Sequence, residues 1–177
     1  FLWHGVCLLE ERGRVLYGVA TVRLIALVFS LVIALLWPCP APAVTLNPGD
    51  IVVAERGDAN KAIVHVDPIT GAQTQISSGG FFVEPHGLVV SQNGDILVAD
   101  VNAFGGGGAI IRVNPVTGAQ TTVSSGGSFA DPVGLAIGTG GHLFVVDAAA
   151  FGGSGGIIRV DPLTGVQTTV SSGGFFV

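Results

Sequence analysis

The second half of the chain repeats itself, and this repetition constrains the fold more than any other feature of the sequence. The segments "AIIRVNPVTGAQTTVSSGG" at residues 109–127 and "GIIRVDPLTGVQTTVSSGG" at residues 156–174 are nearly the same, and a less exact copy precedes them. Their turn motif recurs at Asp67, Asn114 and Asp161, a spacing of 47 residues both times (114 − 67 = 47 and 161 − 114 = 47). A fixed period of this length indicates a repeat architecture built from similar supersecondary units.

Each unit contains four short apolar runs separated by turn-forming residues. In the complete second unit the runs are "GLVVS" (87–91), "DILVA" (95–99), "AIIRV" (109–113) and "AQTTVS" (119–124). They are rich in Val, Ile, Leu and Thr and are too short for independent helices, so they predict strands. The connectors "QNGD" and "NPVTG" favour hairpins, because Asn, Asp and Gly accept the backbone angles of tight turns and Pro presets one of them.

Four antiparallel strands in about 47 residues are typical of one blade of a β-propeller. A parallel β-helix would repeat at roughly half this length, and a β-sandwich would not repeat residue by residue. The second strand of the complete unit, residues 96–99, is apolar without alternation, as expected for a strand that is covered on both faces. We therefore predict an all-β fold: a β-propeller with four-stranded antiparallel blades, preceded by a helical N-terminal signal segment.

The order of the strands also predicts how many blades the chain holds. "PGDIVVAE" aligns with "NGDILVAD", the second strand of a unit, so the first blade begins without its inner strand. We expect a partial propeller over residues 44–177, with about 2.7 blades at residues 48–80, 84–127 and 131–174. A closed propeller has about 4–8 blades. The chain is thus interpreted as an incomplete fragment, which on its own exposes apolar blade faces and aggregates or oligomerises.

The residues before Val44 have the layout of a secretory signal peptide. Arg23 is followed by an uncharged apolar run at 24–37 and by Ala-Pro-Ala at 41–43. The run is shorter than the roughly 20 residues that cross a bilayer. We predict a signal peptide over residues 19–43, with an uncleaved N-terminal anchor as the alternative, and hence a secreted, periplasmic or cell-surface protein. Because the sequence contains no methionine, residues 1–18 are interpreted as a possible upstream extension.

The composition after the signal excludes several classes of partner. From Val44 onward the chain has 4 Lys/Arg and 10 Asp/Glu residues, a formal charge of −6 (4 − 10 = −6). An acidic domain lacks the positive surface that nucleic acid requires. Both cysteines precede this part, so a disulfide framework and thiolate metal sites are not expected in it. We also expect no membrane contact once the signal has been removed.

The segment "EPHGLVVSQNGDILVADVNAFGGGGAIIRVNP" (84–115) resembles an NHL repeat, and residues 131–162 resemble it again. The resemblance implies a propeller. Similar repeats occur in streptogramin-lyase-like proteins, in gluconolactonase-like metal-dependent hydrolases and in exported propellers regarded as binding modules. The glycine-rich insertions "AFGGGG" and "AFGGSGG" depart from the usual repeat, which has a short polar loop there.

Strand alternation predicts which loops share a face of the propeller. The loops that join one blade to the next and those that join the second strand to the third lie on the same side, which we call face one. This channel-mouth face carries the distinctive phenylalanines Phe81, Phe82, Phe104, Phe129 and Phe151. It also carries the candidate binding residues, which are Glu84, His86, Asp100, Asn102, Asp131 and Asp147.

Each candidate has a structural and a functional interpretation. Asp100 and Asp147 recur at one blade position, as does Glu55, which favours hydrogen bonds to loop backbone once per blade. The functional alternative is a ring of carboxylates that binds Ca²⁺, since this cation prefers oxygen ligands. His86 departs from the repeat, because Val133 replaces it in the next blade. An ordinary variant of the blade is the favoured interpretation of this histidine, and an acid/base or ligand role is the alternative. The phenylalanines either pack over their own blade edges or form an apolar binding surface.

The sequence therefore predicts an exported propeller that binds a partner or serves as a structural module. The partner would be a small molecule, a glycan or a protein at the channel-mouth face. No residue is assigned as catalytic or as a metal ligand, and no cofactor is expected beyond the Ca²⁺ alternative. The alternative function is a propeller enzyme, either a metal-dependent lactonase-like hydrolase or a streptogramin-lyase-like lyase, with its site on face one.

Overall fold

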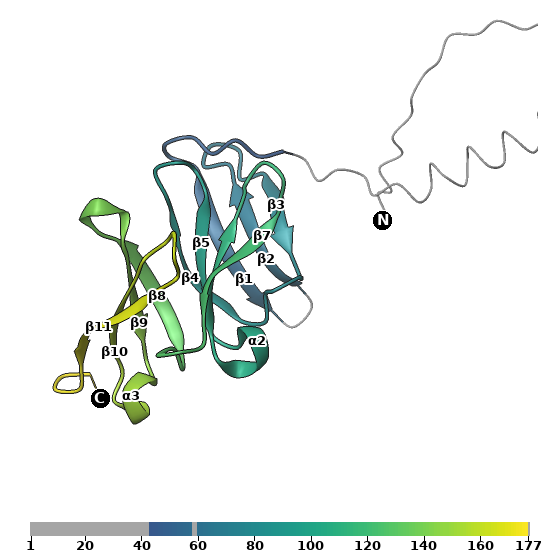
Figure 1. Ribbon diagram of the computed structural model, residues 1–177. Coiled ribbons are helices and arrows are strands. Elements are labelled where there is room, and N and C mark those ends of the chain that lie inside the picture. Colours follow the sequence, from purple (N-terminus) through teal and green to yellow (C-terminus); the bar gives the residue numbers. More distant parts are fainter. Residues whose placement is uncertain (1–42, 58–59, 177) are drawn as a thin grey trace, which may run out of the picture. The chain divides into compact units, whose positions relative to one another are not determined.

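The computed structural model describes residues 43–57 and 60–176 (Figure 1). The predicted upstream extension lies outside the described residues, and so does the predicted signal peptide except for its last residue. Within the described ranges, no helix is long and apolar enough to cross a membrane.

Three antiparallel sheets follow one another along the chain (Figure 1). The first sheet contains β1 (Ile51–Gly57), β2 (Asn60–Val66) and β3 (Gln73–Ser78). The second contains β4 (Pro85–Val90), β5 (Ile96–Asp100), β6 (Ala109–Val113) and β7 (Gln120–Ser125). The third contains β8 (Pro132–Ile137), β9 (Leu143–Asp147), β10 (Gly156–Val160) and β11 (Gln167–Ser172). Strands adjacent in sequence pair with each other in every sheet, so the predicted four-stranded blades and the three-stranded first blade are confirmed.

The turn between the last two strands of each blade follows from its sequence. In the first blade, Asp67 Oδ1 accepts hydrogen bonds from the backbone N–H groups of Ile69 and Thr70, both at 2.8 Å. Gly71 then adopts a φ of 71°, a left-handed conformation that favours glycine. Asn114 and Asp161 cap the corresponding turns in the other two blades in the same way.

The hydrophobic cores lie between the blades. Strand β5 is buried along its whole length because its side chains alternate between two cores. Ile96 and Val98 contribute to the core shared with the first blade, whereas Leu97 and Ala99 contribute to the core shared with the third. This arrangement explains why the strand is apolar without alternation.

A hydrogen-bonded contact at the outer edge, which we call the Gln–Ser latch, joins neighbouring blades. The side-chain Nε2 of Gln120 at the start of β7 donates to Ser77 Oγ and to the carbonyl of Gly79 in the preceding blade, both at 3.0 Å. Ser77 Oγ donates in turn to the carbonyl of Gly118 at 2.8 Å. The same set of bonds recurs between the second and third blades, where the residues are Gln167, Ser124, Gly126 and Gly165.

The glycine-rich insertions contain one helical turn each, which the sequence did not predict. These turns are α2 (Ala103–Gly106) and α3 (Ala150–Gly153), and Figure 1 shows them at the same end of their sheets. Buried Ala103 and Ala150 anchor them against the blades. The turns are irregular, because Phe104 and Phe151 have φ values of 54° and 58°.

Candidate functional site

A cluster of four polar side chains lies on face one at the boundary of the first two blades. Arg56 comes from the end of β1, Glu84 from the loop before β4, His86 from β4 and Asn102 from the loop after β5. Arg56 Nη1 is 2.8 Å from His86 Nε2 and 3.6 Å from Glu84 Oε1. Glu84 Oε1 is also 3.3 Å from His86 Nε2, and Glu84 Oε2 accepts a hydrogen bond from Asn102 Nδ2. We call these four residues the polar cluster.

The two contacts of His86 Nε2 require different protonation states. An unprotonated Nε2 accepts a hydrogen bond from Arg56, whereas a protonated Nε2 donates to Glu84 and cannot accept from the guanidinium. The nitrogen cannot do both at once. In any one tautomer, one of these two contacts is a hydrogen bond and the other is only a close approach of polar atoms.

Glu84 is held in its ionised form by its neighbours. The hydrogen bond with His86, the hydrogen bond from Asn102 and the charge of Arg56 together lower the pKa of Glu84 below its ordinary value. The side chains of Arg56, Glu84 and His86 are 58 %, 38 % and 23 % exposed, so a ligand can reach the cluster from solvent.

Asp100 and Asp147 are buried beneath the loops of face one. Asp100 accepts hydrogen bonds from the backbone N–H groups of Val83 at 2.8 Å and Glu84 at 3.0 Å. Asp147 accepts from Ala130 and Asp131 in the same way. These are the loop-backbone bonds that the structural interpretation predicts, and Asp100 positions the loop that carries Glu84. A binding role for either carboxylate stays a prediction.

Glu55 occupies the aligned position in the first blade but makes a different contact. It is exposed, and its Oε1 accepts a hydrogen bond from the N–H of Gly57 at 2.7 Å. In the described structure β1 pairs only with β2, so no inner strand and no preceding loop lie beside it. Glu55 therefore binds backbone at the end of its own strand, whereas Asp100 binds the backbone of the loop that precedes its blade.

The third blade does not reproduce the polar cluster. Asp131, Val133 and Ala149 stand where the second blade has Glu84, His86 and Asn102. Asp131 and Asp147 thus lie together in the third blade, apart from the other candidates, and the binding role of Asp131 also stays a prediction. The structure brings Glu84, His86 and Asn102 into contact.

The sequence analysis missed Arg56. A signal for it exists, because Arg56 lies at the face-one end of the second strand, where the later units have Val101 and Ala148. A charged residue at a position that is otherwise apolar departs from the repeat in the same way as His86. Only the fold, however, shows that these two departures face each other across neighbouring blades.

The phenylalanines of face one divide into buried and exposed sets. Phe82 and Phe129 are 4 % and 6 % exposed and belong to the cores between blades. Phe81 and Phe104 are 40 % and 50 % exposed, and their ring centroids are 5.2 Å apart. The ring of Phe151 lies over Gly156 of its own blade, because a Cβ built on Gly156 would be 2.8 Å from a ring carbon. The packing interpretation therefore holds for Phe82 and Phe129, and a binding role of the exposed Phe81 and Phe104 stays a prediction.

A metal site is not evident from the geometry of the described residues. Among residues 43–57 and 60–176, no group of three or more His, Cys, Asp or Glu side chains is placed to hold a metal ion. The Ca²⁺ alternative stays a prediction.

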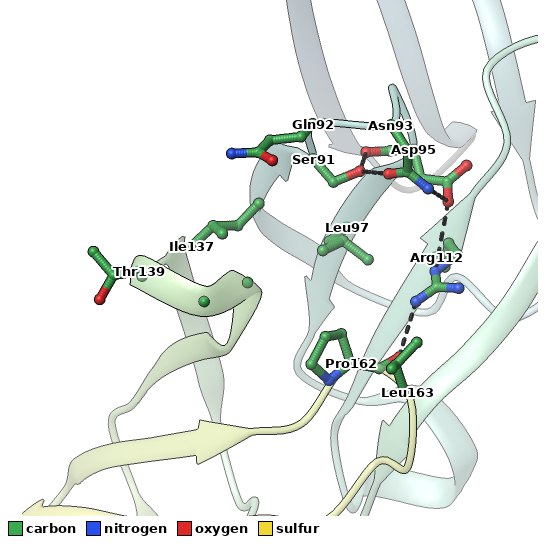
Figure 2. A pocket seen from close by; sticks show the side chains of 13 residues that line it. Ser91, Gln92, Asn93, Asp95, Leu97, Arg112, Ile137, Thr139, Pro162 and Leu163 are labelled. Carbon is green, nitrogen blue, oxygen red and sulfur yellow. Dashed lines mark hydrogen bonds and ion pairs between the residues drawn. The ribbon is translucent and has the colours of Figure 1, made fainter.

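A cavity of about 470 Å³ opens on the side opposite face one, between the second and third blades. Figure 2 shows Arg112 bridging its walls. Its Nη2 donates to the carbonyl of Pro162 at 2.9 Å, and its Nε lies 3.8 Å from Asp95 Oδ2. Because Asp95 neutralises Arg112 and a backbone carbonyl occupies one of its donors, the pair holds the two blades together.

The equivalent place between the first two blades is filled by the chain itself. Val44 is 7 % exposed within the core, and its N–H donates to the carbonyl of Pro115 at 3.3 Å. Pro115 corresponds to Pro162 in the repeat, and His65 replaces Arg112. His65 pairs instead with Asp50 at 3.3 Å, which leaves the carbonyl for Val44. The cavity is therefore a gap between the second and third blades. The segment that carries Val44 closes the corresponding gap between the first two blades.

Comparisons with known proteins agree with the architecture. The NHL repeat family matches residues 82–104. No curated protein gives a significant sequence match. A crystal structure of a mutant puromycin hydrolase complexed with PGG aligns with a TM-score of 0.50 and 20 % identity, over 76 % of this chain and 21 % of that chain. A protein provisionally described as a gluconolactonase aligns with a TM-score of 0.42 and 21 % identity, over 64 % of this chain and 35 % of that chain.

These relationships concern the fold. The chain spans about a fifth of the length of the puromycin hydrolase that it matches. The matched repeat covers the inner and second strands of the second blade and the loop that carries Asn102. Because its three sheets form propeller blades and the NHL repeat model matches the second blade, the chain is a β-propeller protein that carries an NHL repeat.

Proposed function

We propose that this protein is an exported binding module that recognises a polyhydroxylated ligand, such as a glycan, at the polar cluster on face one. The observation that supports the proposal is the cluster itself. Arg56, Glu84, His86 and Asn102 depart from the repeat, come from two blades and contact one another at the surface. Residues that maintain a blade recur in every blade, whereas these do not.

The chemistry of the cluster suits hydroxyl groups. Glu84 offers carboxylate oxygens that accept hydrogen bonds, and the exposed guanidinium of Arg56 offers N–H donors beyond the one directed at His86. A sugar hydroxyl both donates and accepts, so neighbouring hydroxyls can bind the two side chains together. Phe81 and Phe104 add exposed aromatic surface on the same face, against which the apolar side of a sugar ring can pack.

A glycan-binding experiment tests the proposal. The full chain is screened against an array of neutral and acidic oligosaccharides, and bound sugars are then titrated by calorimetry. We expect Glu84→Gln and Arg56→Gln to weaken binding at least tenfold, about 1.4 kcal/mol. The matched controls are Asp131→Asn, at the position of Glu84 in the third blade, and Arg159→Gln, which is exposed on β10. Absence of sugar binding, or equal losses in the controls, would refute the proposal.

Hydrolysis is the second candidate, and the pairing of His86 with Glu84 favours it. An imidazole beside a carboxylate is a common arrangement for general acid–base catalysis, and both groups are accessible from solvent. A panel of lactones and esters, assayed with and without added Ca²⁺, tests this function. Catalysis requires that His86→Gln abolish turnover while binding of the substrate persists. If the unaltered protein binds these compounds without turnover, hydrolysis is rejected and the proposal of a binding module stands.

A further inference from the structure

The two glycine-rich insertions have the same backbone, but their phenylalanine rings lie in different places. Phe104 and Phe151 occupy the same position of the repeat, with φ and ψ of 54° and 42° in the second blade and of 58° and 41° in the third. The glycine that follows each of them is also left-handed. Because the two backbones agree, the neighbours of each ring determine where it lies.

In the third blade the ring lies on a glycine of its own blade. A Cβ built on Gly156 would be 2.8 Å from one ring carbon of Phe151 and 3.0 Å from another. Two carbon atoms in favourable contact are about 3.5–4.0 Å apart. The ring of Phe151 therefore occupies space that is open only because residue 156 has no side chain.

In the second blade this space is filled by an alanine. Ala109 aligns with Gly156 (156 − 109 = 47) and is 0 % exposed. Its Cβ takes the place that the ring uses in the third blade, so Phe104 cannot lie on its own strand in the same way. The ring of Phe104 packs against Phe81 instead, with centroids 5.2 Å apart and planes inclined by 43°. We call Phe81 and Phe104 the aromatic pair.

Phe81 is the second departure from the repeat that forms the pair. Ser128 replaces it in the next blade (128 − 81 = 47). The backbone at the two positions is held alike, because the N–H of Phe81 donates to Gln120 Oε1 and that of Ser128 to Gln167 Oε1, both at 2.7 Å. The second blade therefore presents two rings, whereas the third presents a serine and a ring that covers its own strand.

The aromatic pair lies on the same two loops as part of the polar cluster. Phe81 and Glu84 share the loop before β4, and Asn102 and Phe104 share the segment after β5. The hydrogen bond from Asn102 to Glu84 joins these segments as the pair does. At no more than about 3.6 Å per residue, the Cα atoms of Phe81 and Glu84 are within about 11 Å, and those of Asn102 and Phe104 within about 7 Å. One disaccharide can therefore contact both groups.

We propose that the aromatic pair selects pyranose sugars over acyclic polyols, and that Ala109 is the positioning residue that keeps Phe104 in the pair. This inference rests on the proposed function. A pyranose ring directs C–H groups to one side, and this apolar side packs on exposed aromatic carbon while hydroxyls at its edge reach Glu84. An acyclic polyol carries similar hydroxyls, but it has no rigid apolar side and loses more conformational freedom on binding.

The role of Ala109 is tested without a ligand. In NMR spectra of the full chain, nuclear Overhauser effects between the rings of Phe81 and Phe104 report the pair. Ala109→Gly supplies the residue that the third blade has here and should weaken these signals at least threefold, because the ring can then lie on its strand. The matched control is Ala62→Gly, at the aligned and buried position of the first blade, which should leave the signals unchanged. Circular dichroism confirms that both variants are folded.

The selectivity is tested with cellobiose, which has two pyranose rings, and with sorbitol, which is acyclic. Both are titrated against the full chain by NMR. We expect cellobiose to bind at least tenfold more tightly than sorbitol. Phe81→Ser and Ala109→Gly should each lower this preference at least threefold and leave the affinity for sorbitol unchanged. Phe151→Ser removes the ring of the third blade and should change neither affinity.

The outcomes separate this inference from the proposed function. Equal binding of the two compounds, with both affinities reduced by Glu84→Gln, would keep the polar cluster as a binding site and overturn the selectivity of the aromatic pair. Equal losses in Phe81→Ser and Phe151→Ser would overturn it as well. Unchanged ring signals in Ala109→Gly would overturn the positioning role, whatever the sugars do. Absence of binding by any sugar would refute the proposed function and the selectivity together.

Discussion

Asp100 illustrates how one residue can position the polar cluster without facing it. Its carboxylate is 0 % exposed and accepts hydrogen bonds from the backbone of Val83 and Glu84. These bonds hold the loop from which the Glu84 side chain reaches His86 and Asn102. Charge-assisted bonds of this kind are stronger than bonds between neutral groups. The orientation of the cluster therefore depends on a buried residue that the repeat supplies in the next blade as well.

Asp100→Ala should destabilise the protein strongly. The substitution leaves two partly buried N–H groups without an acceptor, at a cost of about 1–3 kcal/mol each. We expect the free energy of unfolding in urea to fall by about 2–5 kcal/mol. Glu55→Ala, at the aligned but exposed position, should change it by no more than about 0.5 kcal/mol. Similar losses in both variants would contradict the role assigned to Asp100.

The ionisation of Glu84 provides a second prediction at this scale. Its pKa lies below the ordinary value of 4.5 because His86, Asn102 and Arg56 favour the carboxylate. A depressed pKa means that the contribution of Glu84 to stability is present above pH 4.5 and is lost as the pH falls through the lower pKa of the folded state. Carbon-13 NMR of the Glu84 carboxyl should show a midpoint below 4.5, and His86→Ala should raise it. A midpoint at or above 4.5 in the unaltered protein would contradict the contacts of the cluster.

At the scale of elements, the approach of adjacent blades depends on glycine. Gly118 and Gly165 lie in the turns just before the last strands of their blades, where the neighbouring backbone leaves no room for a Cβ. The Gln–Ser latch lies directly beyond them and joins the same two strands. Repetition of "TG" at this point therefore reflects packing between blades as well as the conformation of the turn.

Gly118→Ala and Gly94→Ala separate these two causes. Both glycines have positive φ, 69° and 87°, so both substitutions strain the backbone. Only Gly118 has a carbonyl oxygen 2.6 Å from the Cβ position. We expect Gly118→Ala to lower the free energy of unfolding by about 1–3 kcal/mol more than Gly94→Ala, which is the usual cost of overpacking. Equal losses would mean that backbone conformation alone requires the glycine.

At the scale of the whole molecule, stability resides between blades. Two hydrophobic clusters, one at each blade boundary, contain nearly all of the large buried side chains among the described residues. The second blade contributes to both clusters, whereas the first and third contribute to one each. Residues 43–50 enter on the side opposite face one, because Val44 contacts Pro115 in a turn of that side.

Hydrogen exchange should follow this arrangement. Backbone amides in β5 and β6 are covered from both sides, so they should exchange more slowly than those in β1 and β11. The measurement is made by mass spectrometry on the dilute protein. Uniform protection of all blades in the dilute protein would contradict the account of the core.

The fold could be predicted from the sequence further than the site could. The period of 47 residues, the apolar runs and the turn residues are local properties, and each identifies a strand or a hairpin by itself. The helical turns α2 and α3 were not predicted because each contains a phenylalanine with left-handed backbone angles, a conformation that residues other than glycine rarely adopt. His86 was found as a departure from the repeat, and Glu84 and Asn102 were found as polar residues of the face-one loops. Arg56 was missed because its partner lies in another blade.

The repeat by itself determined the blade, its four strands and the assignment of loops to faces, because these features follow from short-range turn chemistry and from alternation along the chain. Only the tertiary structure decided which departures from the repeat meet. Arg56 and His86 are 30 residues apart and belong to different sheets, yet they are in contact because blades pack side by side. Such contacts depend on the distance and rotation between blades, which no single unit of the sequence encodes.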